Sequence, residues 1–249
     1  MSQMGSIDTM NADNIISVQT KLFGLIAEHA QTNRLFVLTN RLIKNRQSNA
    51  MIIPMNIRED DFYFTLSNMK KSHVNGAYIA AEYQESAVEL LEKSDTLVKL
   101  AQRCDFVLRE GETLEGFYLL PLAIKAYIQT LGASKIAIVG SNGLAKALAY
   151  VLDDCELSFY DPQIEAIMQM ATDLGKELDI NRIDHDMKND FSSFDLLIDT
   201  DDLDLYHEAT LFPKTALKPF LEHSESGWMG YEALLEPLST LLFENYIKD

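Results

Sequence analysis

The chain has few of the residues that build covalent or metal frameworks. Its 249 residues include only two cysteines, Cys104 and Cys155, which are far apart in the sequence. A disulfide scaffold or a cysteine metal site requires more cysteines at closer spacing. The histidines show no i, i+4 pair and no H-x-H spacing; they are His29, His73, His185, His207 and His223. The sequence therefore predicts reduced thiols and no metal centre.

Basic residues and long apolar runs are also scarce. Lys and Arg total 21 against 38 Asp and Glu, a formal net charge of −17. Such a charge repels nucleic acid and acidic membranes, so neither is expected as a partner. No apolar run approaches the roughly 20 residues that span a bilayer, and the first residues, MSQMGSIDTMNADN, do not follow the pattern of a secretion signal. We expect an acidic, cytoplasmic protein with a small-molecule ligand; the sequence does not indicate an oligomeric state.

Three motifs of hydrolysis and calcium binding are missing. No serine lies in a G-x-S-x-G elbow, and the glycine-containing turn at Gly140 lacks the G-K-S/T of a P-loop. The acidic run Asp199–Asp204 lacks the glycine and the closing glutamate of an EF-hand loop. Ester hydrolysis, NTP hydrolysis and an EF-hand are therefore not supported.

A short apolar run that ends in glycine stands near the middle of the chain. In Lys135–Leu148 (KIAIVGSNGLAKAL), four apolar residues lead directly into the turn Gly140–Gly143. This pattern predicts a buried strand, a tight turn and a helix. Backbone N–H groups at the helix start would let an anionic phosphate approach the glycines. The candidate nucleotide-binding residues are Gly140, Ser141, Asn142, Gly143 and Leu144.

An acid at the end of the next apolar run supports a nucleotide site. Asp161 closes Leu157–Tyr160 and stands about 20 residues after Gly140, near the spacing at which a carboxylate binds a ribose hydroxyl. The G-x-G-x-x-G pattern is incomplete, so a strand–turn–helix without ligand remains the alternative. If a nucleotide binds, the acid favours NAD over NADP, because a 2′-phosphate would face a carboxylate.

Strand and helix patterns alternate, which favours a mostly parallel α/β sheet. We expect a helix from Ile15 to His29, a strand at Leu35–Leu38 and then a basic connector, Thr39–Asn49. Its Arg41, Lys44 and Arg46 would form either a solvated loop or an anion-binding loop. The other expected strands are Met51–Ile57 at a sheet edge because of Pro54, Gly76–Ala81, a hairpin of Phe106–Arg109 with Leu114–Leu119, Asn181–Asp184 and Phe194–Asp199. The other expected helices are Asp60–Met69, one or two within Ser86–Leu100, Pro121–Leu131, Ile164–Leu174 and a tail within Met229–Tyr246.

This order of elements resembles the shikimate dehydrogenase family from about Leu35 onward. The family pattern G-x-N-V-T-x-P-x-K corresponds to Gly76–Gln84, and L-x-G-x-N-T-D-G corresponds to Leu114–Pro121. The family's glycine turn G-A-G-G-A corresponds to Gly140–Leu144, and its D-x-x-x-N-A-T places Thr200 at a strand end beside the nucleotide.

The resemblance implies a two-lobed α/β fold: a substrate-type domain, a Rossmann-like NAD(P)-binding domain, and a C-terminal helix that returns to the first lobe. The expected segments are a flexible start at 1–14, the substrate-type domain at 15–121, the nucleotide domain at 122–215 and C-terminal helices at 216–249.

The chain departs from the family at the residues that carry chemistry. The family's catalytic lysine falls on Gln84 and its catalytic aspartate on Leu120, and neither side chain can exchange a proton at neutral pH. The family's S-x-S-P loop, which binds the substrate carboxylate, has no recognisable counterpart, and the connector Thr39–Asn49 is expected to be shortened there. In Tyr231-Glu232-Ala233, glutamate replaces a glutamine and adds negative charge beside an anionic substrate.

Two functions are compatible with these features. The first is a shikimate dehydrogenase-like, NAD(P)-dependent oxidoreductase for a small hydroxylated compound other than shikimate, with a cleft lined by Tyr83, Gln84, Asp105 and Glu232. The second is a non-catalytic nucleotide- or metabolite-binding protein with the same fold. They differ in whether proton transfer is possible.

Overall fold

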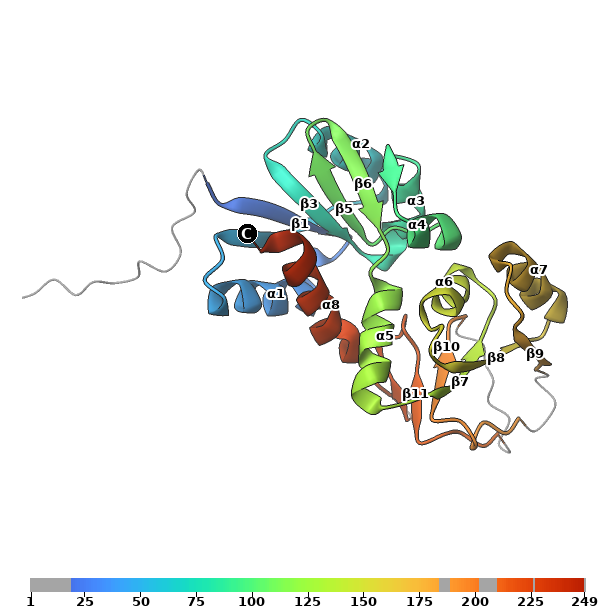
Figure 1. Ribbon diagram of the computed structural model, residues 1–249. Coiled ribbons are helices and arrows are strands. Elements are labelled where there is room, and N and C mark those ends of the chain that lie inside the picture. Colours follow the sequence, from blue (N-terminus) through green and yellow to red (C-terminus); the bar gives the residue numbers. More distant parts are fainter. Residues whose placement is uncertain (1–18, 184–188, 202–209, 226, 249) are drawn as a thin grey trace, which may run out of the picture.

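A computed structural model describes residues 19–183, 189–201, 210–225 and 227–248 as two lobes connected by one helix (Figure 1). The predicted flexible start at 1–14 lies outside the described residues. Each lobe is built on a sheet with six strands among the described residues. The prediction of a two-lobed α/β fold with parallel-rich sheets is confirmed.

The first lobe contains a mixed sheet of strand order β2-β1-β3-β5-β6-β4. Strand β1 pairs in parallel with β2 and β3, whereas β5 runs antiparallel to β3 and β6. The strands are β1 Lys21–Ala27, β2 Ala50–Asn56, β3 Val74–Ile79, β4 Lys93–Ser94, β5 Phe106–Glu110 and β6 Thr113–Phe117. The helices are α1 Arg34–Asn45, α2 Glu59–Met69, α3 Gln84–Val88 and α4 Thr96–Ala101. Pro54 lies on the edge strand β2, as predicted.

The start of the lobe differs from the prediction. The expected helix Ile15–His29 is wrong where the structure describes it, because Lys21–Ala27 forms the strand β1. This strand is covered by neighbours on both sides and lacks the alternating pattern of a half-exposed strand. Its apolar residues also fit helical spacing, so the pattern was ambiguous.

The expected strand Leu35–Leu38 and the expected connector Thr39–Asn49 are also wrong, because helix α1 occupies most of both segments. Asn33 caps this helix by accepting a hydrogen bond from the N–H of Leu35, and the buried face of the helix carries Leu35, Thr39 and Ile43. Thr39 breaks the apolar pattern, but its hydroxyl donates to the carbonyl of Leu35 at 2.8 Å. The basic residues of this segment lie on the exposed surface of α1 and its end.

The second lobe contains a parallel sheet of order β12-β11-β10-β7-β8-β9. The strands are β7 Lys135–Val139, β8 Glu156–Asp161, β9 Asp179–Arg182, β10 Leu196–Asp199, β11 Thr215–Leu217 and β12 Trp228–Met229. Helices α6 (Gly143–Val151) and α7 (Ile164–Leu174) belong to this lobe, and α5 (Leu120–Leu131) connects it to the first. The sheet continues beyond residue 215, so the predicted boundary there is wrong: β11 and β12 lie in the segment expected to contain only helices.

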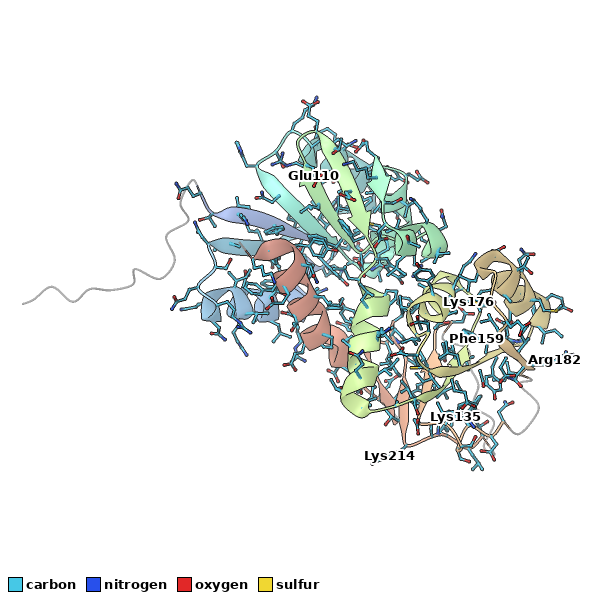
Figure 2. The ribbon with its side chains drawn as sticks, in the orientation of Figure 1. Glu110, Lys135, Phe159, Lys176, Arg182 and Lys214 are labelled. Carbon is cyan, nitrogen blue, oxygen red and sulfur yellow. The ribbon has the colours of Figure 1, made fainter. Side chains whose placement is uncertain are left out.

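Residues at strand starts show which end of this sheet faces the first lobe. Lys135 begins β7 and Lys214 precedes β11. Figure 2 places both side chains on the side of the second lobe that is remote from the first lobe. The carboxyl ends of the parallel strands therefore point toward the first lobe, where ligands bind in open α/β sheets.

The tail returns to the first lobe, as predicted. It consists of a 3-10 turn Tyr231–Leu234, helix α8 (Leu235–Leu242) and a π-helical turn Phe243–Ile247. Helix α8 lies beside α1 and α5 (Figure 1). The ring of Tyr246 lies 4.7 Å from that of Phe106 and 4.8 Å from that of Phe117. One apolar core runs through both lobes and this tail, which fixes the lobes against each other. Among the described residues, no helix is long and apolar enough to cross a membrane.

Candidate functional site

A cleft of about 400 Å³ lies between the lobes. Its walls come from the segment between β1 and α1, the segment after β3, the start of α5, the loop after β11 and the start of the tail. The segment between β1 and α1 supplies one wall of the cleft, and its first two residues, Glu28 and His29, were expected to be helical. The start of helix α1 carries a signal in the sequence. Asn33 is a preferred helix-capping residue, and it precedes apolar residues at helical spacing, such as Leu38 and Leu42.

The two residues aligned with the family's catalytic pair both line this cleft. Gln84 is 3% exposed, and its amide nitrogen donates to the carbonyl of Ile79 at 3.3 Å. Its amide oxygen has no hydrogen-bond partner among the described residues. Leu120 contributes an apolar side chain to the same cleft. These two positions thus provide an unpaired buried acceptor and a hydrocarbon surface, and neither can exchange a proton.

Two tyrosine hydroxyls form the polar part of the cleft floor. The hydroxyls of Tyr78 and Tyr231 are 2.8 Å apart, and both residues line the cleft. Burial raises the pKa of both phenols, and the nearby Asp105 adds to the effect. Both hydroxyls therefore stay protonated at neutral pH and act as hydrogen-bond donors and acceptors, not as bases.

Two of the four predicted cleft residues do not line the cleft. Tyr83 is turned toward α2: its hydroxyl donates to the carbonyl of Ile57 at 2.7 Å and its ring stacks on Phe62 at 4.6 Å. Asp105 is fully buried and accepts hydrogen bonds from the backbone N–H groups of Leu119 (2.6 Å) and Leu120 (2.7 Å). Asp105 thus positions the start of α5 from behind the cleft.

Burial raises the pKa of Asp105 to about 7. The two backbone N–H groups favour its charged form and oppose this shift, but loss of solvent has the larger effect.

The cleft rim is rich in carboxylates. Glu232, which sequence analysis placed here, accepts a hydrogen bond from the Ser224 N–H at 3.2 Å, and its carboxylate lies 3.6 Å from the Arg34 guanidinium and 3.7 Å from His223. Hydrogen bonds from Ser224 and His223 hold the pKa of Glu232 below its usual range. The rim residues that sequence analysis did not assign to the cleft are Glu28, His29, Arg34, Glu82, Glu222 and His223. Four carboxylates therefore surround the opening, and the Arg34 guanidinium is the permanent positive charge among the residues that line it.

The glycine turn lies at the carboxyl end of β7. Gly140 has a φ of +103°, a backbone conformation that glycine adopts without strain. Asn142 caps α6 by accepting a hydrogen bond from the Ala145 N–H at 3.0 Å. Its amide nitrogen also donates to the carbonyl of Thr200 at 2.7 Å, which ties the turn to the end of β10. The predicted residues of the glycine turn and Thr200 therefore lie side by side.

The other predicted nucleotide-binding residues differ in which of their groups could contact a nucleotide. Asp161 ends β8, is 7% exposed and accepts a hydrogen bond from the Gln163 N–H at 2.8 Å. Leu144 is 1% exposed as a whole residue, so it offers a ligand almost no surface. A Cβ on Gly143 would lie 2.1 Å from the carbonyl oxygen of Ala101, so this glycine is needed for contact between the lobes.

The donor chemistry of this region fits a dinucleotide. Backbone N–H groups at the start of α6 and the Asn142 amide suit phosphate oxygens, and the Asp161 carboxylate suits a ribose hydroxyl. The space above Gly140 is shared with the chain itself, because a Cβ there would lie 2.5 Å from the Thr200 hydroxyl and 2.6 Å from an Asp201 carboxylate oxygen. Among the described residues, no cluster of acids, histidines or cysteines is suited to a metal ion.

Comparisons with known proteins agree with this architecture. No family model matches the chain. The chain is 24% identical to the shikimate dehydrogenase (NADP(+)) of Pyrococcus furiosus over 237 residues, which cover 92% of this chain and 81% of that protein.

Two solved structures with the same fold are a shikimate dehydrogenase from Aquifex aeolicus and a 5-ketofructose reductase from Gluconobacter sp. strain CHM43. The first has a TM-score of 0.70 at 16% identity and covers 94% of this chain and 96% of its own. The second has a TM-score of 0.67 at 12% identity, with the same coverages of 94% and 96%.

The structure is a two-domain α/β protein with the fold of the solved shikimate dehydrogenases. The resemblance to the shikimate dehydrogenase family, first seen in the glycine turn and its neighbours, is confirmed over both lobes.

Proposed function

We propose that the chain is a shikimate dehydrogenase-like, NAD(P)-dependent oxidoreductase that acts on a small hydroxylated compound other than shikimate. The observation that carries this proposal is the combination of a carboxylate-rich rim with an uncharged polar floor in the cleft. A nicotinamide dinucleotide, which would supply or accept hydride, would be held by Gly140–Leu144, Asp161 and Thr200.

The rim disfavours a substrate that carries a carboxylate. Glu28 and Glu82 lie side by side, with the Glu28 N–H donating to the Glu82 carboxylate at 2.9 Å. Arg34, the permanent cation of the rim, lies 3.6 Å from Glu232, so one arginine faces four carboxylates. A ligand carboxylate in the cleft would be repelled by these carboxylates. Shikimate and quinate would meet this repulsion, whereas a neutral polyol or hydroxyketone would not.

The floor suits hydroxyl and carbonyl oxygens. The hydroxyls of Tyr78 and Tyr231, which line the cleft, can donate to a ligand oxygen, whereas the unpaired amide oxygen of Gln84 is closed to solvent. Because both phenols stay protonated, they are better placed to polarise a carbonyl during reduction than to remove a proton from an alcohol. We therefore propose carbonyl reduction as the favoured direction.

The names of the structural relatives support a substrate other than shikimate, although they do not identify it. One protein with this fold is named a shikimate dehydrogenase and another a 5-ketofructose reductase. The fold is thus found in proteins named for different substrates.

The second candidate is a metabolite-binding protein without turnover. It is favoured by Gln84 and Leu120, which put no titratable group at the two positions where the family carries its catalytic pair. This candidate predicts the same ligand class and no change in NAD(P)H absorbance.

A ligand panel separates these possibilities. Thermal shift and NAD(P)H absorbance should be measured with shikimate, quinate, neutral polyols and neutral hydroxyketones. We expect stabilisation by neutral compounds only, and turnover of a hydroxyketone if the chain is an enzyme. A Glu28→Gln, Glu82→Gln variant should bind shikimate better, whereas Glu110→Gln, at the far tip of the first lobe in Figure 2, should not. Wild-type binding of shikimate in preference to every neutral compound would refute the proposal.

A further inference from the structure

Asp201 follows the end of β10 and places its carboxylate on the glycine turn. One carboxylate oxygen accepts a hydrogen bond from the Asn142 amide at 2.5 Å, and the carboxylate also accepts from the backbone N–H of Ser141. The other oxygen lies 2.6 Å from the position of a Cβ on Gly140. The side-chain-free surface of Gly140, which would admit a phosphate, therefore contacts an anionic group of the same chain.

We propose that Asp201 is an internal ligand of the glycine turn, whose carboxylate competes with the phosphates of a dinucleotide and sets the affinity of this lobe for any such nucleotide. The identity of the nucleotide rests on the proposed function, whereas the competition rests on the contacts of Asp201 alone.

The turn is held more firmly than the carboxylate that occupies it. Asn142 is fixed by its bonds to the Ala145 N–H and to the Thr200 carbonyl. Asp201 is exposed to solvent, and beyond the turn its backbone N–H donates to the Asp199 carboxylate at 3.2 Å. A phosphate that takes the same donors must therefore displace the Asp201 side chain, and the turn can keep its shape while this happens.

The surrounding charges make simultaneous occupancy unfavourable. Asp161 is close enough to interact repulsively with Asp201, and Arg103 is the nearby positive group. Arg103 is already hydrogen-bonded to Glu85 at 2.6 Å and lies over the Phe220 ring at 5.2 Å. A phosphate added beside two carboxylates would be repelled by both.

Two acids thus have separable effects on nucleotide binding. Asp201 faces the place where a diphosphate would lie, which NAD and NADP share, so it should weaken both equally. Asp161 faces the place where the ribose would lie, where the two nucleotides differ, so it should affect their ratio. If only the net charge of the lobe mattered, removing either acid would have the same effect. It would not change the affinity for both nucleotides in one variant and the NAD-to-NADP ratio in the other.

Calorimetric titration of the full chain with NAD, NADP and pyrophosphate tests the inference. In Asp201→Ala we expect each of the three to bind about tenfold tighter or more, because the phosphate regains charge-assisted hydrogen bonds, and the NAD-to-NADP ratio should not change. Asp201→Asn keeps the size of the side chain without the charge and should show a smaller gain. Asp154→Ala removes one exposed acid beyond the far end of α6 and serves as the matched control, with no gain expected.

The outcomes separate this inference from the proposed function. Tighter binding of pyrophosphate by Asp201→Ala, without binding of NAD or NADP, supports the internal ligand and contradicts the cofactor. Equal binding of all three probes by wild type and Asp201→Ala, or no binding of any probe by either, overturns the internal ligand. Unfolding temperatures of the variants show whether each is folded, and Asp201→Asn gives a second variant if Asp201→Ala is not.

Discussion

Replacing Asp105 by asparagine tests how this buried acid supports the cleft. Its carboxylate accepts hydrogen bonds from the backbone N–H groups of Leu119 and Leu120, and burial raises its pKa from 3.8 to about 7. Between these two values the native protein holds a proton that the unfolded chain releases. The contribution of Asp105 to the free energy of unfolding is therefore greatest at low pH and is lost as the pH rises toward about 7.

The size of this effect follows from the shift. One pKa unit corresponds to about 1.4 kcal/mol, so the shift of Asp105 gives an upper bound of about 4 kcal/mol. Asparagine cannot titrate, and its NH2 group would face one of the two backbone N–H groups, at a cost of about 1–3 kcal/mol that does not depend on pH. Asp105→Asn should thus be less stable than wild type near pH 4, and equally stable or more stable near pH 8.

Denaturant unfolding, followed by the fluorescence of the single tryptophan, Trp228, measures this difference across the pH range. Asp195→Asn is the control: this exposed carboxylate accepts hydrogen bonds from Ser134 and Lys135, which lower its pKa, so its effect lies at more acidic pH. A stability difference between wild type and Asp105→Asn that stays constant from about pH 4 to about pH 8 would refute the reasoning.

Three further predictions concern the cleft, the cofactor and the lobe contact. Wild type should not oxidise shikimate with NAD or NADP in an absorbance assay, and activity that appears only in a Gln84→Lys, Leu120→Asp double variant would support the alignment; turnover by wild type at an ordinary dehydrogenase rate would contradict it. Calorimetry should show NAD bound more tightly than NADP because of Asp161, and the reverse order would contradict that role. Gly143→Ala should destabilise the protein by at least about 1–3 kcal/mol in denaturant unfolding, because the new Cβ would lie 2.1 Å from the Ala101 carbonyl; wild-type stability would show that the lobes can shift apart freely.

The second lobe was more predictable from sequence than the start of the first. The connecting helix α5 and helix α7 end at glycines that adopt positive φ, Gly132 at +64° and Gly175 at +61°, and such residues mark helix boundaries directly. The start of the first lobe has no glycine between β1 and α1, and Asn33 is its one helix-start signal. A strand buried on both faces and an amphipathic helix can share the same apolar spacing. In this segment the pairing of β1 with β2 and β3 makes the strand the stable structure.

The sequence predicted which segments meet at the candidate site, but it did not predict in which direction each side chain points. Gln84 and Glu232, two of the four expected cleft residues, stand at positions aligned with the family and line the cleft, whereas Tyr83 and Asp105 do not line it. Tyr83 points toward α2, although it stands next to Gln84, because neighbouring residues of a turn face different directions. The contact of Asp201 with the glycine turn could not be predicted, because it depends on how β10 and β7 are joined in space.

Most departures from the family make the site more negative, and the exception is Leu120, which replaces an aspartate and removes a carboxylate. Glutamine stands at the lysine position, Asp161 puts a carboxylate at the expected ribose position, and Glu232 replaces a glutamine, so each of these three removes positive charge or adds negative charge. Asp201 adds a carboxylate at the glycine turn, and Glu28 and Glu82 add two at the cleft rim. Charges within a few ångströms of a ligand act together, so these changes disfavour anionic ligands at both ends of the site. A neutral substrate avoids this repulsion altogether. A dinucleotide cannot avoid it, because its phosphates are anionic. The competition between these phosphates and the Asp201 carboxylate for the glycine turn should therefore decide whether the protein binds a dinucleotide together with its metabolite or the metabolite alone.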